Sequence, residues 1–168
     1  MKYKLTKKTK TLPNGTVLYQ IQALIDIPNV CKKGDLGGWI ESEKNLSQEN
    51  MCWVSDSAQV SGNAQVYDNA RVYCDARVYE YAQISGYAQV YGYAHVSGNA
   101  YVYNYAHVYD HAHVSGNARV YVLIKFDCDF DPWELFIRMI NNKEKLPLLM
   151  GYDDPDLNKI IEQKLKKS

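Results

Sequence analysis

Side chains that could carry acid–base or metal chemistry gather in one stretch of this 168-residue chain. The four histidines are His95, His107, His111 and His113. An imidazole titrates near neutral pH and can act as a general base. It can also bind zinc, whose catalytic sites bring several protein ligands together around the ion. Either use depends on which of these side chains the fold brings together, so the elements that hold them decide the question.

The middle of the chain repeats every six residues. An aliphatic residue stands at each sixth position from Val54 to Val120, and an alanine precedes it by two positions from Ala58 to Ala118. This period matches neither the stripe of an α-helix, at about 3.6 residues, nor that of a coiled coil, at about 3.5. It predicts short strands with alanine and the aliphatic residue inward, joined by tight turns rich in Gly, Asn and Asp. We therefore predict an all-β solenoid.

The repeat unit Val-Ser-Gly-Asn-Ala-Gln at residues 60–65 resembles the hexapeptide repeat of left-handed parallel β-helix proteins. Residues 34–41, Gly-Asp-Leu-Gly-Gly-Trp-Ile-Glu, stand ahead of such repeats. In this they resemble an uncharacterised group of bacterial and prophage proteins that are often labelled transferases. The resemblance implies a triangular prism with three hexads per coil and a left-handed turn of the chain.

Three regions follow along the chain. Residues 1–29 are predicted to form an N-terminal β-hairpin cap with a turn at 13–15, and residues 30–124 a parallel β-helix of about five coils. Residues 125–168 are predicted to form a C-terminal α-helical segment that caps the last coil or joins protomers. Both caps would cover strand edges that an open solenoid leaves exposed. The first coil is expected at Val30, Leu36 and Leu46, with a charged excursion at residues 41–45.

Residues three hexads apart are expected to stack, so the outward strand positions form columns. None of these positions holds an acid; the acids lie in the turns, where Asp and Glu are better suited than in strands. Two explanations of this absence stay open: Asp and Glu are disfavoured in strands, or the outward positions form a mildly basic surface suited to phosphates. The three expected columns are Trp53/Arg71/Gln89/His107, Gln59/Arg77/His95/His113 and Gln65/Gln83/Tyr101/Arg119.

Tyrosine is in excess, with 15 Tyr against 3 Phe and 3 Trp. Most tyrosines fall in the turn triplets of the repeat, and none stands at an inward position. Stacked rings would brace neighbouring coils, and a contiguous aromatic surface is also what protein interfaces use. Two corners of the prism are expected to carry ladders: Tyr73, Tyr91 and Tyr109 with Tyr93 and His111 at the first, and Tyr67, Tyr103 and Tyr121 with Tyr87 and Tyr105 at the last.

The preferred interpretation is a non-catalytic binding module without metal or cofactor. It is expected to be a dimer or trimer that holds a host protein or a small phosphorylated molecule. The resemblance to the prophage group implies counter-defence by sequestering such a partner. The residues predicted to bind are Arg77, His95, His111, His113, Tyr73, Tyr91, Tyr93 and Tyr109.

The alternative is an acyltransferase that uses acetyl-coenzyme A, with His95 or His113 as the base. Many hexapeptide-repeat enzymes have this activity, and the resemblance implies it here. Such enzymes usually extrude a long loop from the coils and build the site between trimer protomers. The repeat from Ala58 to Val120 is uninterrupted, which disfavours this interpretation.

Composition sets the remaining expectations. Nineteen basic residues balance nineteen acidic ones, so no strong net field recruits nucleic acid or an anionic membrane. No apolar run reaches the roughly 20 residues of a membrane span, and no secretory signal is visible at the N-terminus. The four cysteines form no Cys-x-x-Cys pair, which favours reduced thiols and a cytoplasmic location.

Overall fold

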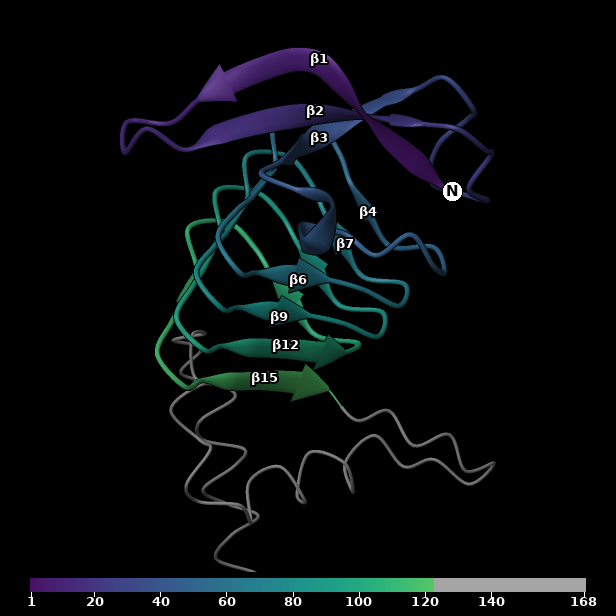
Figure 1. The fold of residues 1–168 in the computed structure, drawn as a ribbon. Helices are drawn as coiled ribbons and strands as arrows, with labels where there is room; N and C mark the ends of the chain where they lie inside the picture. Colours follow the sequence, from purple (N-terminus) through teal and green to yellow (C-terminus); the bar gives the residue numbers. More distant parts are fainter. Residues whose placement is uncertain (123–168) are drawn as a thin grey trace, which may run out of the picture. The chain divides into compact units, whose positions relative to one another are not determined.

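Each coil of the protein consists of three short strands joined by corners of three residues. The computed structural model describes residues 1–122, which form a parallel β-solenoid of about five turns (Figure 1). The predicted C-terminal helical segment lies outside the described residues. Within residues 1–122 no helix is long and apolar enough to cross a membrane.

Strands of successive coils pair in parallel and build three faces. Face 1 consists of β4 (Trp53–Val54), β7 (Arg71–Val72), β10 (Gln89–Val90) and β13 (His107–Val108). Face 2 contains β5 (Gln59–Val60), β8 (Arg77–Val78), β11 (His95–Val96) and β14 (His113–Val114). Face 3 contains β6 (Gln65–Val66), β9 (Gln83–Ile84), β12 (Tyr101–Asn104) and β15 (Arg119–Val122).

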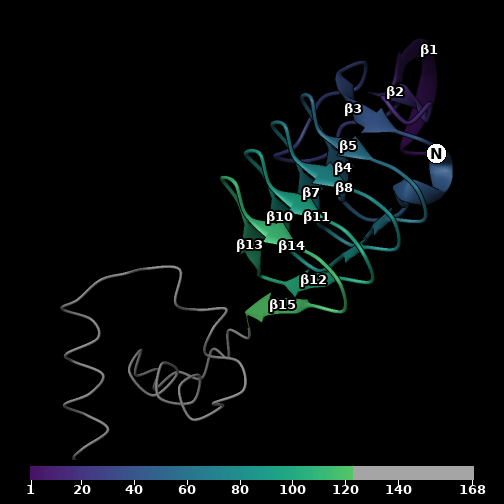
Figure 2. The same ribbon diagram turned by 90° about the vertical axis from the view of Figure 1, so that its left-hand side faces the viewer.

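The strand register confirms the predicted columns. Arg77 pairs with His95, and His95 pairs with His113, so each strand pairs with the equivalent strand three hexads along the chain. Figure 2 shows face 2 with its strands in one row. In Figure 1 the strands of face 3 run from left to right on the near side while the chain descends from its N-terminus. A coil that advances in this way is left-handed, as predicted.

The core is as narrow as the repeat predicts. The inward alanines from Ala58 to Ala106 and the inward aliphatic residues from Val54 to Val102 are buried. Burying one valine side chain stabilises the fold by roughly 1.5–3 kcal/mol. Because each coil repeats the same pair of small residues, neighbouring coils stack without gaps and the outward side chains are carried on a rigid frame.

A left-handed backbone conformation turns the chain at every corner. The middle residue of each corner triplet, from Asp56 to Gly116, has a φ between 55° and 68°. Glycine adopts this conformation at little cost, and Asn and Asp tolerate it. Cys74 and Glu80 also adopt it, although neither side chain favours it. The corner triplets, rich in Gly, Asn and Asp, therefore form the tight turns that their composition predicts.

The first coil departs from the predicted register. Ile40, at the end of β3 (Leu36–Ile40), pairs with Val60, and Leu46 bridges to Val66. Leu36, predicted to be a core residue, is 55% exposed and pairs with β2 instead. Residues 41–45 add no extra residue to the repeat, since Leu46 follows Ile40 by six, but they turn through the 3-10 helix η1 (Glu43–Asn45) in place of the left-handed residue of the later corners. The two extra residues of this coil stand between Leu46 and Val54.

The predicted N-terminal hairpin caps the solenoid. Strands β1 (Tyr3–Thr11) and β2 (Val17–Ala23) are antiparallel, and β2 continues through β3 into face 2. The fully buried Tyr3 donates its hydroxyl to the carbonyl oxygen of Leu46 at 2.7 Å, and its ring lies edge-on to Trp53. Lys2 is buried, and its Nζ donates to the carbonyl oxygens of Glu49 and Cys52.

Candidate functional site

Stacked rings follow the corner between faces 1 and 2. We call Tyr73, Tyr91, Tyr93, Tyr109 and His111 the tyrosine strip. Ring centroids of Tyr73 and Tyr91 are 4.8 Å apart with an interplanar angle of 5°, and those of Tyr91 and Tyr109 are 5.4 Å apart. Tyr93 stacks on His111 at 5.2 Å. Each such pair contributes about 0.5–1.5 kcal/mol beyond the area it buries.

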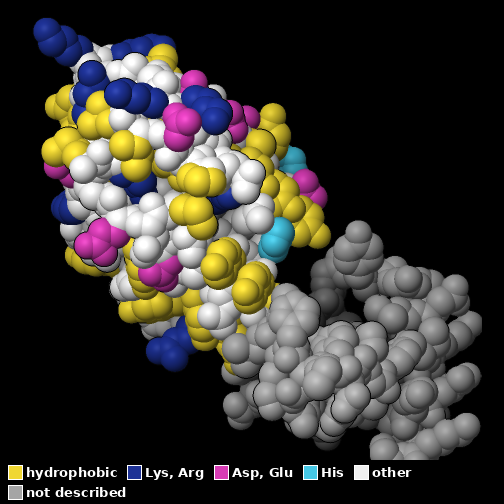
Figure 3. Space-filling view, turned by 90° about the vertical axis from the view of Figure 1, so that its right-hand side faces the viewer, with side chains coloured by type: hydrophobic (Ala, Val, Ile, Leu, Met, Phe, Trp, Pro, Cys, Tyr) yellow, Lys and Arg dark blue, Asp and Glu magenta, His cyan; other side chains and the backbone are white. Residues whose placement is uncertain are grey.

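The corner between faces 3 and 1 carries a second ladder, as predicted. Tyr87 stacks on Tyr105 with centroids 5.1 Å apart, and Tyr103 on Tyr121 at 5.0 Å. In Figure 3 hydrophobic side chains follow one another along the coils, and the visible histidines lie beside them. The tyrosine excess is thus an external framework on two edges of the prism.

Corner tyrosines also reach the outward strand residue of the next coil. Tyr73 donates its hydroxyl to Oε1 of Gln89 at 3.0 Å. Burial and the stacked Tyr91 raise the pKa of Tyr73, so the hydroxyl remains a donor. Where the outward residue is a histidine, the contact becomes edge-to-face: Tyr79 meets His95 at 6.3 Å. The sequence could have indicated this contact, because in both pairs the Gln or His stands 16 residues after the corner Tyr, two fewer than three hexads.

The column of face 2 places two of the predicted binding histidines side by side. The rings of His95 and His113 lie 4.8 Å apart, one coil beyond Arg77. Burial, then the positive charges of His113 and Arg77, hold the pKa of His95 below its usual value. The lowered pKa favours the neutral form of His95, and Arg77 is the permanent cation of the column.

The other two histidines lie elsewhere. His111 stacks within the tyrosine strip, and His107 lies on face 1 against the edge of Tyr91. In the part of the chain that the structure describes, no three His, Cys, Asp or Glu side chains gather as metal ligands would. Between residues 1 and 122 the one ion pair joins Lys32 and Asp26, so no carboxylate there orients His95 or His113 as a catalytic base requires.

Carboxylates in the corners link one coil to the next, a contact that the sequence did not suggest. Oδ2 of Asp68 accepts the backbone N–H of Gly86 at 3.1 Å, and Oε2 of Glu80 accepts that of Gly98 at 2.6 Å. Asp56 does the same for Cys74. These bonds explain why the acids lie in corners: there they accept charge-assisted hydrogen bonds from the coil below. In the sequence, each of these acids stands three hexads before the residue whose backbone N–H it accepts.

Most residues of the predicted binding surface lie outside the two hollows described below. Of its residues only Tyr73 borders either of two hollows, one of about 190 Å³ on face 1 and one of about 480 Å³ beside η1. Small molecules mostly bind in concave sites, whereas exposed aromatic ridges suit larger partners. The strip and the column thus offer rigid, exposed contact area.

Comparison with known proteins supports the fold. The family model described as YdcK Beta solenoid repeat matches residues 64–80, which run from β6 through β8. No curated protein matches the chain. The matched segment contains the Ala-x-Val repeat that forms the coils on either side of it. The sequence match and the strand pairing agree, and the protein is a β-solenoid built from repeats.

Proposed function

We propose that the protein is a non-catalytic binding module that holds another protein along the tyrosine strip and the adjoining column of Arg77, His95 and His113. The observation that carries this proposal is the exposed stack of rings on a rigid edge. Tyr93 is 58% exposed and Tyr109 42%, although the core beneath them is closed. Tyrosine and arginine are enriched where proteins bind one another.

Preorganisation supports the same function. Each ring of the strip is held by its neighbours one coil away, and Tyr73 is also held by its hydrogen bond to Gln89. A partner that docks on rings already fixed in place does not have to order them, so less conformational entropy is lost on binding. Arg77, exposed beside the strip, would meet an acidic group of the partner.

A small phosphorylated ligand is less well supported. The lowered pKa of His95 leaves this column with one permanent charge, whereas phosphates are usually held by several charged or backbone donors. Sequestration of a host protein, as the resemblance to prophage proteins implies, is one use that the strip would suit. Assembly as a dimer or trimer stays a prediction that light scattering tests.

The test compares two matched variants. Tyr93→Ser and Tyr87→Ser each remove the exposed ring of a stacked pair, one from the tyrosine strip and one from the other ladder. A partner retained from bacterial lysate by the parent protein should be lost with Tyr93→Ser and kept with Tyr87→Ser, at equal thermal stability. Equal retention by both variants, or equal loss, would overturn the assignment to the strip.

The acyltransferase hypothesis has its own readout. Acetyl-coenzyme A should leave the melting temperature unchanged, because no loop leaves the coils between Ala58 and Val120 and no described carboxylate orients His95 or His113. Thermal shift with acetyl-coenzyme A and with cyclic nucleotides measures this. Stabilisation by acetyl-coenzyme A, with an acceptor turned over by the parent protein and not by His113→Ala, would replace the binding module with an enzyme.

A further inference from the structure

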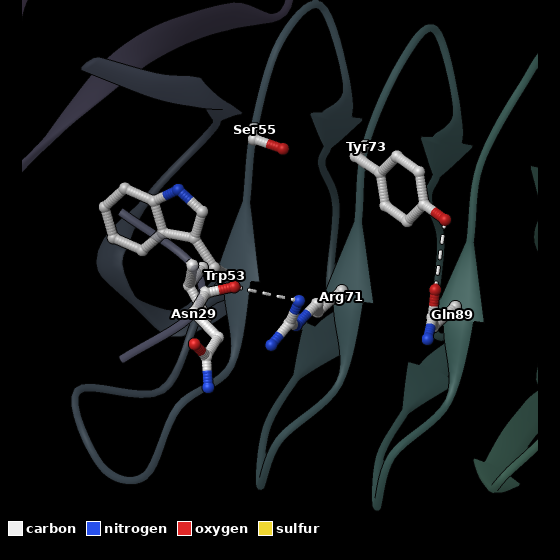
Figure 4. Close-up of a pocket in the computed structure, with 7 residues that line it drawn as sticks. Asn29, Trp53, Ser55, Arg71, Tyr73 and Gln89 are labelled. Carbon is white, nitrogen blue, oxygen red and sulfur yellow. Dashed lines mark hydrogen bonds between the residues drawn. The ribbon is translucent and has the colours of Figure 1, made fainter. Parts of the chain in front are cut away.

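A hollow of about 190 Å³ lies on face 1, where residues 29 and 30 border the first strands of the face (Figure 4). Tyr73 and Val30 supply apolar surface, and Arg71 and Gln89 supply polar groups; Trp53 also borders the hollow but is only 3% exposed. Figure 4 shows Arg71 with Trp53 on one side and Tyr73 and Gln89 on the other. This hollow lies on a different face of the prism from the column of Arg77, His95 and His113.

The charge inside the hollow is positive and unbalanced. Arg71 is its one charged lining residue, and Nη1 of Arg71 donates to the backbone carbonyl oxygen of Asn29 at 3.3 Å. No carboxylate among residues 1–122 pairs with this guanidinium. A guanidinium has five N–H donors, so the bond to Asn29 fixes its orientation and leaves donors for a ligand.

A second donor is set in place beside it. Oε1 of Gln89 accepts the Tyr73 hydroxyl at 3.0 Å, and this bond fixes which way the amide is turned. The amide NH₂ of Gln89 has no acceptor among the described residues and can donate to a ligand. The hollow therefore combines a fixed cation, a fixed amide donor and the ring of Tyr73.

Size and chemistry together select the ligand. A hollow of about 190 Å³ is smaller than the roughly 300–1,000 Å³ of sites for drug-sized molecules and has room for about six waters. A nucleotide or a coenzyme would extend well out of a hollow of this volume. A guanidinium pairs with a carboxylate through two parallel hydrogen bonds, and the flat ring of Tyr73 suits a second ring.

We propose that this hollow binds a small aromatic carboxylate, with the carboxylate on Arg71 and the ring against Tyr73. The site goes beyond the proposed protein-binding function: Tyr73 also belongs to the tyrosine strip, but the cation, Arg71, lies on face 1. A protein partner on the tyrosine strip could be absent while the hollow still binds its ligand.

Benzoate is the probe, titrated into the full chain and followed by NMR at the indole N–H of Trp53 and the guanidinium N–H groups of Arg71. Saturable shifts at both groups are expected. Benzamide has nearly the same shape without the charge and should bind at least about tenfold more weakly. Inorganic phosphate should not displace benzoate at equal concentration, because it gains nothing from the Tyr73 ring.

The matched variants are Arg71→Gln and Arg119→Gln, which change the outward strand position on faces 1 and 3. Arg71→Gln should weaken benzoate binding at least about tenfold, and Arg119→Gln should leave it unchanged. A dispersed spectrum of Arg71→Gln confirms that the variant is folded. Absence of saturable shifts, equal binding of benzamide, displacement by phosphate, or benzoate binding that survives Arg71→Gln would each overturn the proposal.

Discussion

Tyr3 in the cap and Val90 in the coils are both fully buried, but their surroundings differ. Tyr3 contacts segments far along the chain, at Glu43, Leu46 and Trp53, through contacts that occur once in the described residues. Val90 pairs with Val72 and Val108, and the same valine contact recurs along the face. Contacts in the cap are therefore irreplaceable, whereas those in the coils are many and alike.

The largest expected effect is in the cap. Tyr3→Ala removes a buried ring and should lower the free energy of unfolding by about 3–5 kcal/mol, because the first coil closes only around that ring. Tyr3→Phe keeps the ring and loses the hydroxyl bonds to Leu46 and Glu43, at a cost of about 1–3 kcal/mol. Denaturant unfolding measures both. If Tyr3→Ala costs no more than Tyr3→Phe, the ring does not seal the coil.

Next in size is a pair of glycines at the corner between faces 2 and 3. A Cβ at Gly98 would lie 2.7 Å from the backbone nitrogen of Gly116, whereas one at Gly116 meets none of the residues 1–122 within 4 Å. Both have a φ of 66°, so Gly116→Ala should cost about 1 kcal/mol and Gly98→Ala about 1–3 kcal/mol more. Thermal melts compare them. Equal costs would mean that the coils shift apart without penalty.

Tyr91→Leu tests the ladder itself. Tyr91 stacks between Tyr73 and Tyr109 and meets His107 with its edge. Replacing the ring with an aliphatic side chain should cost about 1–3 kcal/mol, the sum of two stacked pairs. Hydrogen exchange should place the loss in the coils that contain these three tyrosines and not in the cap. Loss of protection at Tyr3 instead would show that cap and coils unfold as one unit.

Asp68→Asn is expected to have a smaller effect. The amide oxygen can still accept the N–H of Gly86, but the charge that strengthens that bond is lost. The free energy of unfolding should therefore fall by about 0.5–1 kcal/mol. Asp75→Asn is the control, because the Asp75 carboxylate accepts no hydrogen bond from the described residues. Chemical denaturation of both variants measures the difference, and equal stability would remove the carboxylate from the contacts that join coils.

The smallest effect is the pH dependence of His95, whose pKa is lowered in the folded protein. The folded state then binds its proton less readily than the unfolded state, where the pKa is about 6.5. The stability contributed by neutral His95 is complete above that value and declines as the pH falls below it. Melting temperatures between pH 7.5 and 5 should fall less in His95→Gln than in the parent. Parallel profiles would remove His95 as the cause.

The regular coils could be predicted from the sequence because Ala and Val recur without a gap. The first coil could not, because the two extra residues between Leu46 and Val54 put a backward count in sixes on Leu36 instead of Ile40. The ring ladders followed from tyrosines placed three hexads apart. The contact of Tyr79 with His95 did not follow from the sequence, because the repeat fixes the position of each Cα and not the rotamer of its side chain.

The candidate site, too, could be predicted from the sequence only in part. Arg77, His95 and His113 were correctly placed in one column by counting. The lowered pKa of His95 depends on how deeply its neighbours bury it, which a count does not give. The hollow at Arg71 needs Asn29, 42 positions earlier, to lie beside face 1, and no repeat predicts a contact between the segment before the repeats and the repeats themselves.

The stacked rings of the tyrosine strip have a consequence for how the chain finds its fold. A core of identical Ala–Val hexads would be filled equally well if one coil slipped past its neighbour by a whole hexad, and the corner carboxylates would still meet a backbone N–H. The stack of Tyr73 on Tyr91 would be lost, because Tyr73 would then face Ser85 or Ser97. The ring pairs outside the core thus favour one register for a core that would accept several.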